Sequence, residues 1–396
     1  MIKILKKSPV VIHQLFFLFA QLIILHLYGM GYSGTLAYVG AVSTFLAVLI
    51  NLRWDIEILV SNNSTLHESL LDSSITIFLM TIIVSCLNLV FGSPLPVHII
   101  LSGFVIAIHE LLVSILFVQN KIYTYSFFRA IPAIALILFA LIGFQAEIIW
   151  PASFFVSVFF LMIYLKTLFI RAKKNLSIKR IIKIKFLQKF YAAITATTFS
   201  FFSALFVIII NFYYGNEYVG LWSNTIRIFN SLLIFLLGAS LPFVLNEIRL
   251  KNNTSEKVKT FLFLWLIFCP LIILSFFITS NWGVIMLSLF VDYDFEVPSI
   301  YLGYIVLVAI SISFVGSSQA LYQGINKSIT LLGFIFISAT LGFIYILNFN
   351  QSFIALVELF LISIFTLVIM VLAHLLSLLL FKTNDPKESN SKDFDN

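Results

Sequence analysis

The stretch VVIHQLFFLFAQLIILHLYGMGYSGTLAYVGAVSTFLAVLI, residues 10–50, decides the fold class of this protein. It contains no Asp, Glu, Lys or Arg, and the turn Gly29 to Gly31 divides it into two apolar runs, 10–28 and 32–50. A helix needs roughly 20 predominantly apolar residues to cross a hydrocarbon core about 30 Å thick. The stretch therefore predicts two transmembrane helices joined by a tight turn. The first run lacks an A-x-A cleavage site and is too long for a signal peptide, so we expect it to be retained as a helix.

The whole chain repeats this pattern. Of its 396 residues, 61% are hydrophobic and 10% are charged, and the mean hydropathy is +1.08, a balance that soluble domains do not have. The apolar runs are long and continuous, so the spans are helices and not the short alternating strands of a barrel. Hydropathy and turn residues predict twelve spans, at 10–28, 32–50, 74–92, 97–118, 127–146, 148–166, 190–214, 219–243, 260–279, 299–318, 328–348 and 352–380.

The positions of the basic residues agree with this count. If the N-terminus is cytoplasmic, every Lys and Arg except Arg227 falls in a cytoplasmic loop, at a cytoplasmic helix end or in a tail. That distribution obeys the positive-inside rule, which a miscounted span would break. We therefore predict an all-α, multi-pass protein of the bacterial inner membrane with both termini cytoplasmic.

The longest polar connection divides the chain into two halves. We predict an N-terminal six-helix bundle at 1–170, a basic cytoplasmic linker at 171–189, a C-terminal six-helix bundle at 190–381 and a polar cytoplasmic tail at 382–396.

A short motif occurs once in each half. Tyr28-Gly29-x-x-Tyr32-x-Gly34 recurs as Tyr214-Gly215-x-x-Tyr218-x-Gly220, each time between the first and second helices of its half. Tyr and Gly favour interfacial turns in any case. The identical spacing at equivalent positions nevertheless favours an internal repeat, with the two halves parallel about an axis along the membrane normal.

Few ionisable residues lie inside the spans, where a charge is costly and marks a functional candidate. Asn224, Arg227 and Asn230 or Ser231 form one polar stripe on the eighth span, which we expect to face a cavity. The alternative is an arginine that snorkels outward or pairs with a buried acid. Two further candidates for the substrate path share a face of the first span, where interhelical hydrogen bonding is the alternative role: Gln14 and Gln21.

Glu110 lies near the middle of the fourth span, beside His109 and one turn before Ser114. A protonatable carboxyl group in a span is a candidate for coupling transport to an ion. A structural hydrogen bond within the first bundle is an equally good interpretation.

Basic residues gather on the cytoplasmic side, where they can bind anionic lipid headgroups at about 1 kcal/mol each. Enforcement of the topology is a sufficient alternative explanation. The candidates for headgroup binding are Arg53, Lys173, Lys174, Lys179, Arg180 and Lys183.

Signals for enzymatic chemistry are missing from the sequence. It contains no P-loop, G-x-S-x-G or H-E-x-x-H motif, and no loop is large enough to fold separately. Cys86 and Cys269 lie in apolar spans, where we expect small buried side chains and neither a disulfide nor a metal site. We therefore expect a non-enzymatic protein without cofactor, metal or nucleic-acid partner.

Two stretches resemble a known family. Leu52-Arg53-Trp54-Asp55-Ile56-Glu57-Ile58 looks like an L-R-Y-[DE]-x-A-I motif, with Trp for Tyr and Glu for Ala. Tyr214-Gly215-Asn216-Glu217-Tyr218-Val219-Gly220-Leu221-Trp222, followed by Arg227, is similar to an F-G-x-x-x-V-G-x-Y…R helix. Both motifs, and the twelve-span layout, resemble the Wzx-type O-antigen and polysaccharide flippases of the multidrug/oligosaccharidyl-lipid/polysaccharide exporter superfamily.

This resemblance implies two six-helix bundles around a central cavity that opens alternately to each side. It also implies transport of an undecaprenyl-pyrophosphate-linked glycan, a repeat unit of O-antigen lipopolysaccharide or a related surface polysaccharide, from the cytoplasmic to the periplasmic leaflet. Cation coupling and a polysaccharide polymerase partner are common in such systems. By analogy, Arg227 would meet the pyrophosphate or an acidic sugar.

Two other functions stay open at this point. Drug exporters of the same superfamily place acids in the first or seventh span, and neither 10–28 nor 190–214 contains one. A membrane-embedded polymerase or transferase would be expected to carry a large outer loop or clustered catalytic acids and histidines, and the outer loops here are short.

Overall fold

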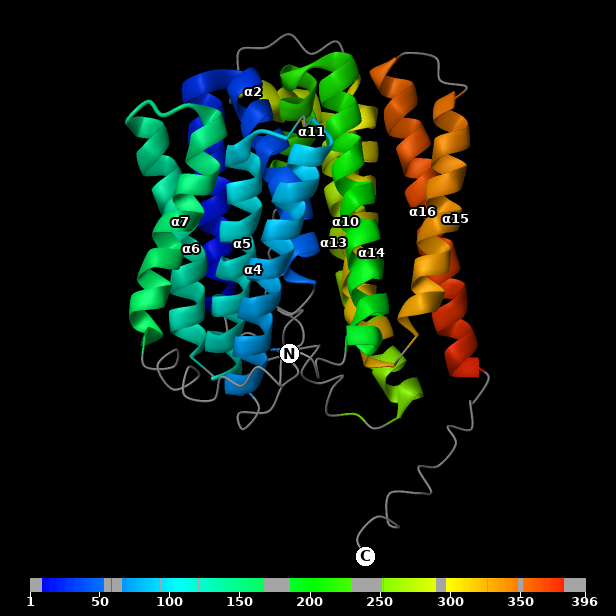
Figure 1. Ribbon diagram of the computed structural model, residues 1–396. Coiled ribbons are helices and arrows are strands. Elements are labelled where there is room, and N and C mark those ends of the chain that lie inside the picture. Colours follow the sequence, from blue (N-terminus) through cyan, green and yellow to red (C-terminus); the bar gives the residue numbers. More distant parts are fainter. Residues whose placement is uncertain are drawn as a thin grey trace, which may run out of the picture.

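The computed structural model describes residues 9–52, 58, 66–92, 95–119, 121–166, 186–229, 251, 253–289, 297–325, 327–347 and 352–380. Within these residues all regular structure is helical (Figure 1). The helices are α2 (Pro9–Asn51), α4 (Leu66–Val90), α5 (Val97–Val118), α6 (Ile122–Leu141), α7 (Ala146–Tyr164), α10 (Phe186–Tyr214), α11 (Asn216–Phe229), α13 (Thr254–Ser288), α14 (Ser299–Gly324), α15 (Ser328–Leu347) and α16 (Phe353–Leu380).

The helices build two hydrophobic cores. One core draws its buried side chains almost entirely from α2 and α4 to α7, and the other draws them almost entirely from α10 to α16. Helix α2 joins the two, because Ala37 belongs to the second core and Tyr38 packs against both. Two bundles therefore lie side by side, with α2 packed against α10 and α11 where they meet (Figure 1).

Nine helices in the described part of the chain are long and apolar enough to cross a membrane. This confirms the predicted all-helical, multi-pass architecture. Each predicted span overlaps a described helix, and the first two spans share α2. The number twelve and the cytoplasmic placement of the termini stay predictions.

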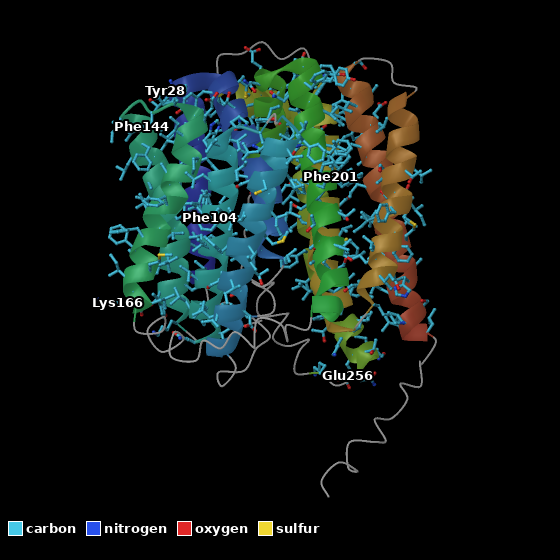
Figure 2. All side chains as sticks on the ribbon, in the orientation of Figure 1. Tyr28, Phe104, Phe144, Lys166, Phe201 and Glu256 are labelled. Atoms are coloured by element: carbon cyan, nitrogen blue, oxygen red, sulfur yellow. The ribbon has the colours of Figure 1, made fainter. Side chains whose placement is uncertain are left out.

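Tyr28 and Phe144 lie at one end of the bundles, and Lys166 and Glu256 lie at the other (Figure 2). We call these the Tyr28 end and the Lys166 end. Under the predicted topology they are the periplasmic and the cytoplasmic ends.

Three predicted boundaries need correction. Gly29 to Gly31 is a kink at one residue and not a loop, because Gly29 has φ 74° and ψ −171° and α2 is helical on both sides of it. The span placed at 127–146 ends at Leu141, because the chain turns at Gly143 with φ 87°. The span placed at 260–279 belongs to a helix that begins at Thr254 and ends at Ser288. Hydropathy marks the part of a helix in hydrocarbon, whereas polar residues can continue the helix beyond it.

Candidate functional site

The site lies where the two copies of the repeated motif meet. Gly29 and Gly215, the first glycines of the two copies, have φ 74° and φ 82°. A residue with a Cβ is strained in this left-handed region, whereas glycine enters it freely. In each copy the chain therefore reverses at a single residue, and the following helix begins at once.

The second glycines bring the two copies into backbone contact. A Cβ atom added to Gly34 would lie 1.7 Å from the carbonyl oxygen of Asn216, and one added to Gly220 would lie 2.3 Å from that of Met30. Asn216 and Met30 each follow the first glycine of their own copy, so the contact is reciprocal. The copies therefore pack against each other about a local pseudo-two-fold axis.

The tyrosines of each copy fasten it to its own half. Tyr28 donates to the carbonyl oxygen of Ala140, and Tyr32 donates to that of Phe144 over 2.6 Å. The rings of Tyr28 and Tyr32 stack, with 4.5 Å between centroids.

In the second copy, the ring centroids of Tyr214 and Tyr218 lie 5.6 and 4.9 Å from that of Phe353. Phe353 begins α16, the last helix of the second half, just as Phe144 lies just before α7, the last helix of the first. Each copy thus contacts a residue at the start of the last helix of its half, the first copy through a hydrogen bond and the second through ring packing.

A buried polar cluster lies between the halves, further from the Tyr28 end than the two first glycines. We call Gln21, Ser33, Asn224 and Arg227 the inter-half cluster. The Gln21 amide donates to Asn224 Oδ1 over 2.9 Å, and Asn224 Nδ2 donates to Ser33 Oγ over 3.1 Å. Asn224 Nδ2 also lies 3.3 Å from the sulfur of Met30. Gln21, Ser33 and Asn224 are almost completely buried, so these hydrogen bonds satisfy groups that would otherwise be costly to bury.

Arg227 completes the cluster. Its guanidinium donates to Gln21 Oε1, and its side chain is half-buried. A rise of about 1.5 Å per residue places Arg227 about 18 Å along α11 from Gly215, close to the middle of a hydrocarbon core.

Within the described residues, no carboxylate lies within ion-pair distance of Arg227. Its charge and its remaining N–H groups suit a carboxylate or phosphate ligand.

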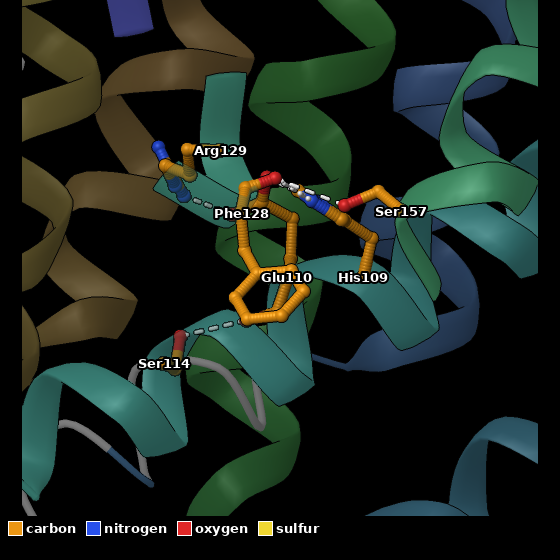
Figure 3. Close-up of polar contacts among 6 residues, drawn as sticks. All are labelled: His109, Glu110, Ser114, Phe128, Arg129 and Ser157. Atoms are coloured by element: carbon orange, nitrogen blue, oxygen red, sulfur yellow. Dashed lines mark hydrogen bonds and ion pairs between the residues drawn. The ribbon is translucent and has the colours of Figure 1, made fainter. Parts of the chain in front are cut away.

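A second polar cluster lies inside the first half (Figure 3). Glu110 on α5 forms an ion pair with Arg129 on α6, and Arg129 also lies over the ring of Tyr125 at 5.3 Å. His109 Nδ1 is 3.6 Å from Glu110 Oε1. Ser157 on α7 donates to the carbonyl oxygen of Phe128 over 2.9 Å. The cluster therefore ties three helices of one bundle together.

This pairing bears on the role of Glu110. The sequence put Arg129 at a helix end, but it lies two turns into α6, opposite Glu110. A carboxylate already neutralised by a guanidinium serves the structural role that the sequence left open. Ion coupling by Glu110 stays a prediction. The described residues contain no group of His, Cys, Asp and Glu that could hold a metal.

The structure brings together three predicted site residues, Gln21, Asn224 and Arg227. Sequence reasoning missed Ser33 and Met30, and their place inside the repeated motif was the available signal. The expectation of buried cysteines was wrong, because Cys86 and Cys269 are both exposed on helix surfaces. The side chain of Gln14 is not described, and the other predicted residues lie outside the described part of the chain: Arg53, Lys173, Lys174, Lys179, Arg180, Lys183, Asn230 and Ser231.

Comparison with known proteins identifies the fold. No family model and no curated protein matches the sequence. Among solved structures, the MATE multidrug transporter DinF-BH superposes with a TM-score of 0.66 at 14% identity, covering 94% of this chain and 95% of that one. The chain has the fold of a MATE transporter.

Other structures with the MATE fold agree over the same extent. The Vibrio cholerae MATE transporter VcmN in its bent form gives a TM-score of 0.59 at 11% identity and covers 94% of this chain and 96% of that one. A transporter of the MOP superfamily from Pyrococcus furiosus gives 0.57 at 14% identity, with 94% and 95% covered. The likenesses support the coarser prediction, an all-α fold of the kind that MATE transporters have.

Proposed function

We propose that this protein is a flippase that moves an undecaprenyl-pyrophosphate-linked oligosaccharide, a repeat unit of O-antigen or a related surface polysaccharide, from the cytoplasmic to the periplasmic leaflet. The observation that carries the proposal is Arg227, which lies half-buried between the two bundles with no carboxylate partner among the described residues. The proposal also rests on the resemblance of the sequence motifs to Wzx-type flippases.

The energetics of Arg227 favour an anionic substrate. A charge near the middle of the bilayer costs several kcal/mol, and a purely structural role would be filled more stably by an apolar side chain. A pyrophosphate that passes between the bundles would recover part of this cost through charge-assisted hydrogen bonds. Gln21 holds the guanidinium in place through its amide oxygen.

The neutral members of the inter-half cluster suit the sugar. In the present conformation, the amides of Gln21 and Asn224 and the hydroxyl of Ser33 bond to one another across the two halves. If the halves separate, the same groups become free to bond to glycan hydroxyls. A polar glycan needs such partners to pass through hydrocarbon. The polyprenyl chain would stay in the lipid.

Export of cationic drugs is the second candidate, because DinF-BH, a multidrug transporter, has this fold. Two observations weigh against it. The inter-half cluster contains a cation and no acid, and neither α2 nor α10 contains an Asp or Glu. The Pyrococcus furiosus protein is described as having a binding pocket of reverse polarity, so pocket charge varies within this fold.

The test is deletion of the gene in its native host, followed by complementation with wild type, Arg227→Gln, Arg227→Lys and the control Lys166→Gln at matched protein levels. A charge-assisted hydrogen bond contributes about 1.5–3 kcal/mol, so Arg227→Gln should lower the rate of glycan export about ten-fold or more. Arg227→Lys should retain part of it, and Lys166→Gln all of it. A normal amount of surface polysaccharide in the Arg227→Gln strain would show that Arg227 does not bind the substrate during export. Unchanged polysaccharide in the deletion strain, with altered sensitivity to cationic dyes, would favour drug export.

A further inference from the structure

The second half contains an apolar groove that the transport site does not use. It lies between α13, α14 and α16 and has a volume of about 980 Å³, at the upper end of the range for ligand pockets. Its lining is apolar except for Lys259, Thr260 and Ser311, and Lys259 is the only charged residue among the described lining residues. The groove therefore offers a long hydrocarbon surface with one cation.

The cation lies at one end of the groove. Along α13 the lining begins at Lys259, one turn from Glu256 at the Lys166 end (Figure 2), and reaches Ile272. Thirteen residues of helix span about 20 Å. Half of a bilayer with its headgroups is also about 20 Å thick. The groove thus matches the depth of one lipid monolayer, with Lys259 at headgroup level.

The floor of the groove is well packed, and its rim is exposed. Trp265 and Phe314 are buried with their ring centroids 5.0 Å apart, and the Trp265 indole donates to Ser317 over 3.2 Å. On the rim, Phe263 and Leu266 are 64% and 68% exposed. A hydrocarbon chain would therefore meet a preformed floor between exposed apolar side chains.

The charge at the mouth is available to an anion. Lys259 is exposed, and no described carboxylate lies within ion-pair distance of it. Glu256 contacts Lys251 instead, with 3.9 Å between Nζ and Oε2. A phosphate at headgroup level would find the Lys259 ammonium unpaired.

We propose that this groove binds one anionic phospholipid of the leaflet at the Lys166 end, with an acyl chain in the groove and the phosphate beside Lys259. The depth of one monolayer favours an acyl chain over a longer polyprenyl chain. The site is independent of the transport function proposed above, because it lies within one half and away from the inter-half cluster.

The test uses purified full-length protein in detergent and a phosphatidylglycerol probe with a photoactivatable diazirine at the end of one acyl chain. We expect cross-links in the peptides around Cys269 and Phe365, which line the groove away from Lys259. One basic residue near a phosphate changes affinity about five-fold. Lys259→Gln should therefore lower labelling about five-fold, and Lys166→Gln, an exposed lysine at the same end, should leave it unchanged.

Three outcomes would overturn the proposal. Equal labelling by a phosphatidylcholine probe of the same chain length would show that charge is irrelevant. Undiminished labelling of Lys259→Gln would show that the Lys259 ammonium does not bind the phosphate. Displacement of the probe by undecaprenyl phosphate but not by unlabelled phosphatidylglycerol would assign the groove to a polyprenyl chain. None of these results depends on transport, so none of them tests the flippase proposal.

Discussion

Replacement of Gly34 by alanine tests the contact between the two repeats. The new Cβ would lie 1.7 Å from the carbonyl oxygen of Asn216 and 2.9 Å from the nitrogen of Gly220. Both are backbone atoms, so the clash cannot be relieved by rotating a side chain. Ordinary van der Waals contact begins near 3.4 Å. Helices α2 and α11 would therefore have to separate by about 1.7 Å at this point.

The consequence reaches the inter-half cluster. The hydrogen bond from Gln21 to Asn224 is 2.9 Å long, and a separation of about 1.7 Å would take it beyond hydrogen-bonding distance. Overpacking costs about 1–3 kcal/mol, and each lost hydrogen bond about 0.5–1.5 kcal/mol. We expect Gly34→Ala to destabilise the present conformation by about 2–4 kcal/mol.

The assay is thermal unfolding of the purified protein, with two related variants for comparison. In Gly220→Ala the nearest atom is the Met30 carbonyl oxygen at 2.3 Å, so the required movement is smaller. In Gly31→Ala the nearest atom is the Glu217 Cγ at 3.9 Å, which needs no movement. The unfolding midpoint should be highest for Gly31→Ala, lower for Gly220→Ala and lowest for Gly34→Ala. Equal midpoints for Gly31→Ala and Gly34→Ala would refute the reasoning.

Three further substitutions test neighbouring parts of the account. Asn224→Ala should destabilise the protein by about 1–3 kcal/mol, because its buried partners lose their bonds; an unchanged thermal midpoint would contradict the cluster. Breaking a fully buried ion pair costs roughly 3–5 kcal/mol. Glu110→Gln should destabilise the protein by less than this, because the Glu110 and Arg129 side chains are 34% and 26% exposed. The double variant Glu110→Gln with Arg129→Gln should recover part of the lost stability. Additive losses in that double-mutant cycle would disprove the coupling. Gly215→Ala should destabilise the protein by about 1–2 kcal/mol, because alanine is strained at φ 82°. Nothing crowds the Cβ of the control Gly333→Ala, so equal unfolding midpoints for the two variants would rule out backbone strain at residue 215.

Features that follow the local sequence were predictable. Apolar length predicted the helices, because each span must by itself be long enough to cross hydrocarbon. The spacing of Tyr28-Gly29 and Tyr214-Gly215 predicted the repeat, and the two copies share the left-handed glycine. The polar stripe on the eighth span placed Asn224 and Arg227 on one face of the helix, and both side chains form a hydrogen bond with Gln21.

Features that depend on a second helix were not predictable. Glu110 and Arg129 are 19 residues apart, on different helices, and the helix that carries Arg129 begins earlier than hydropathy indicates. Ser33 was missed because one serine in an apolar run most often bonds to its own helix, and only its place inside the repeated motif marked it. The close approach of Gly34 and Gly220 needed both halves in place.

The most direct test of the central claim is a flipping assay in vesicles that contain the purified protein and a fluorescent undecaprenyl-pyrophosphate-linked oligosaccharide. The fraction of substrate in each leaflet is read from its accessibility to a membrane-impermeant quencher. The account predicts that wild type moves the substrate faster than empty vesicles, and that Arg227→Gln is about ten-fold slower or more than wild type. A wild-type rate equal to that of empty vesicles, with active transport of a cationic dye by the same vesicles, would contradict it.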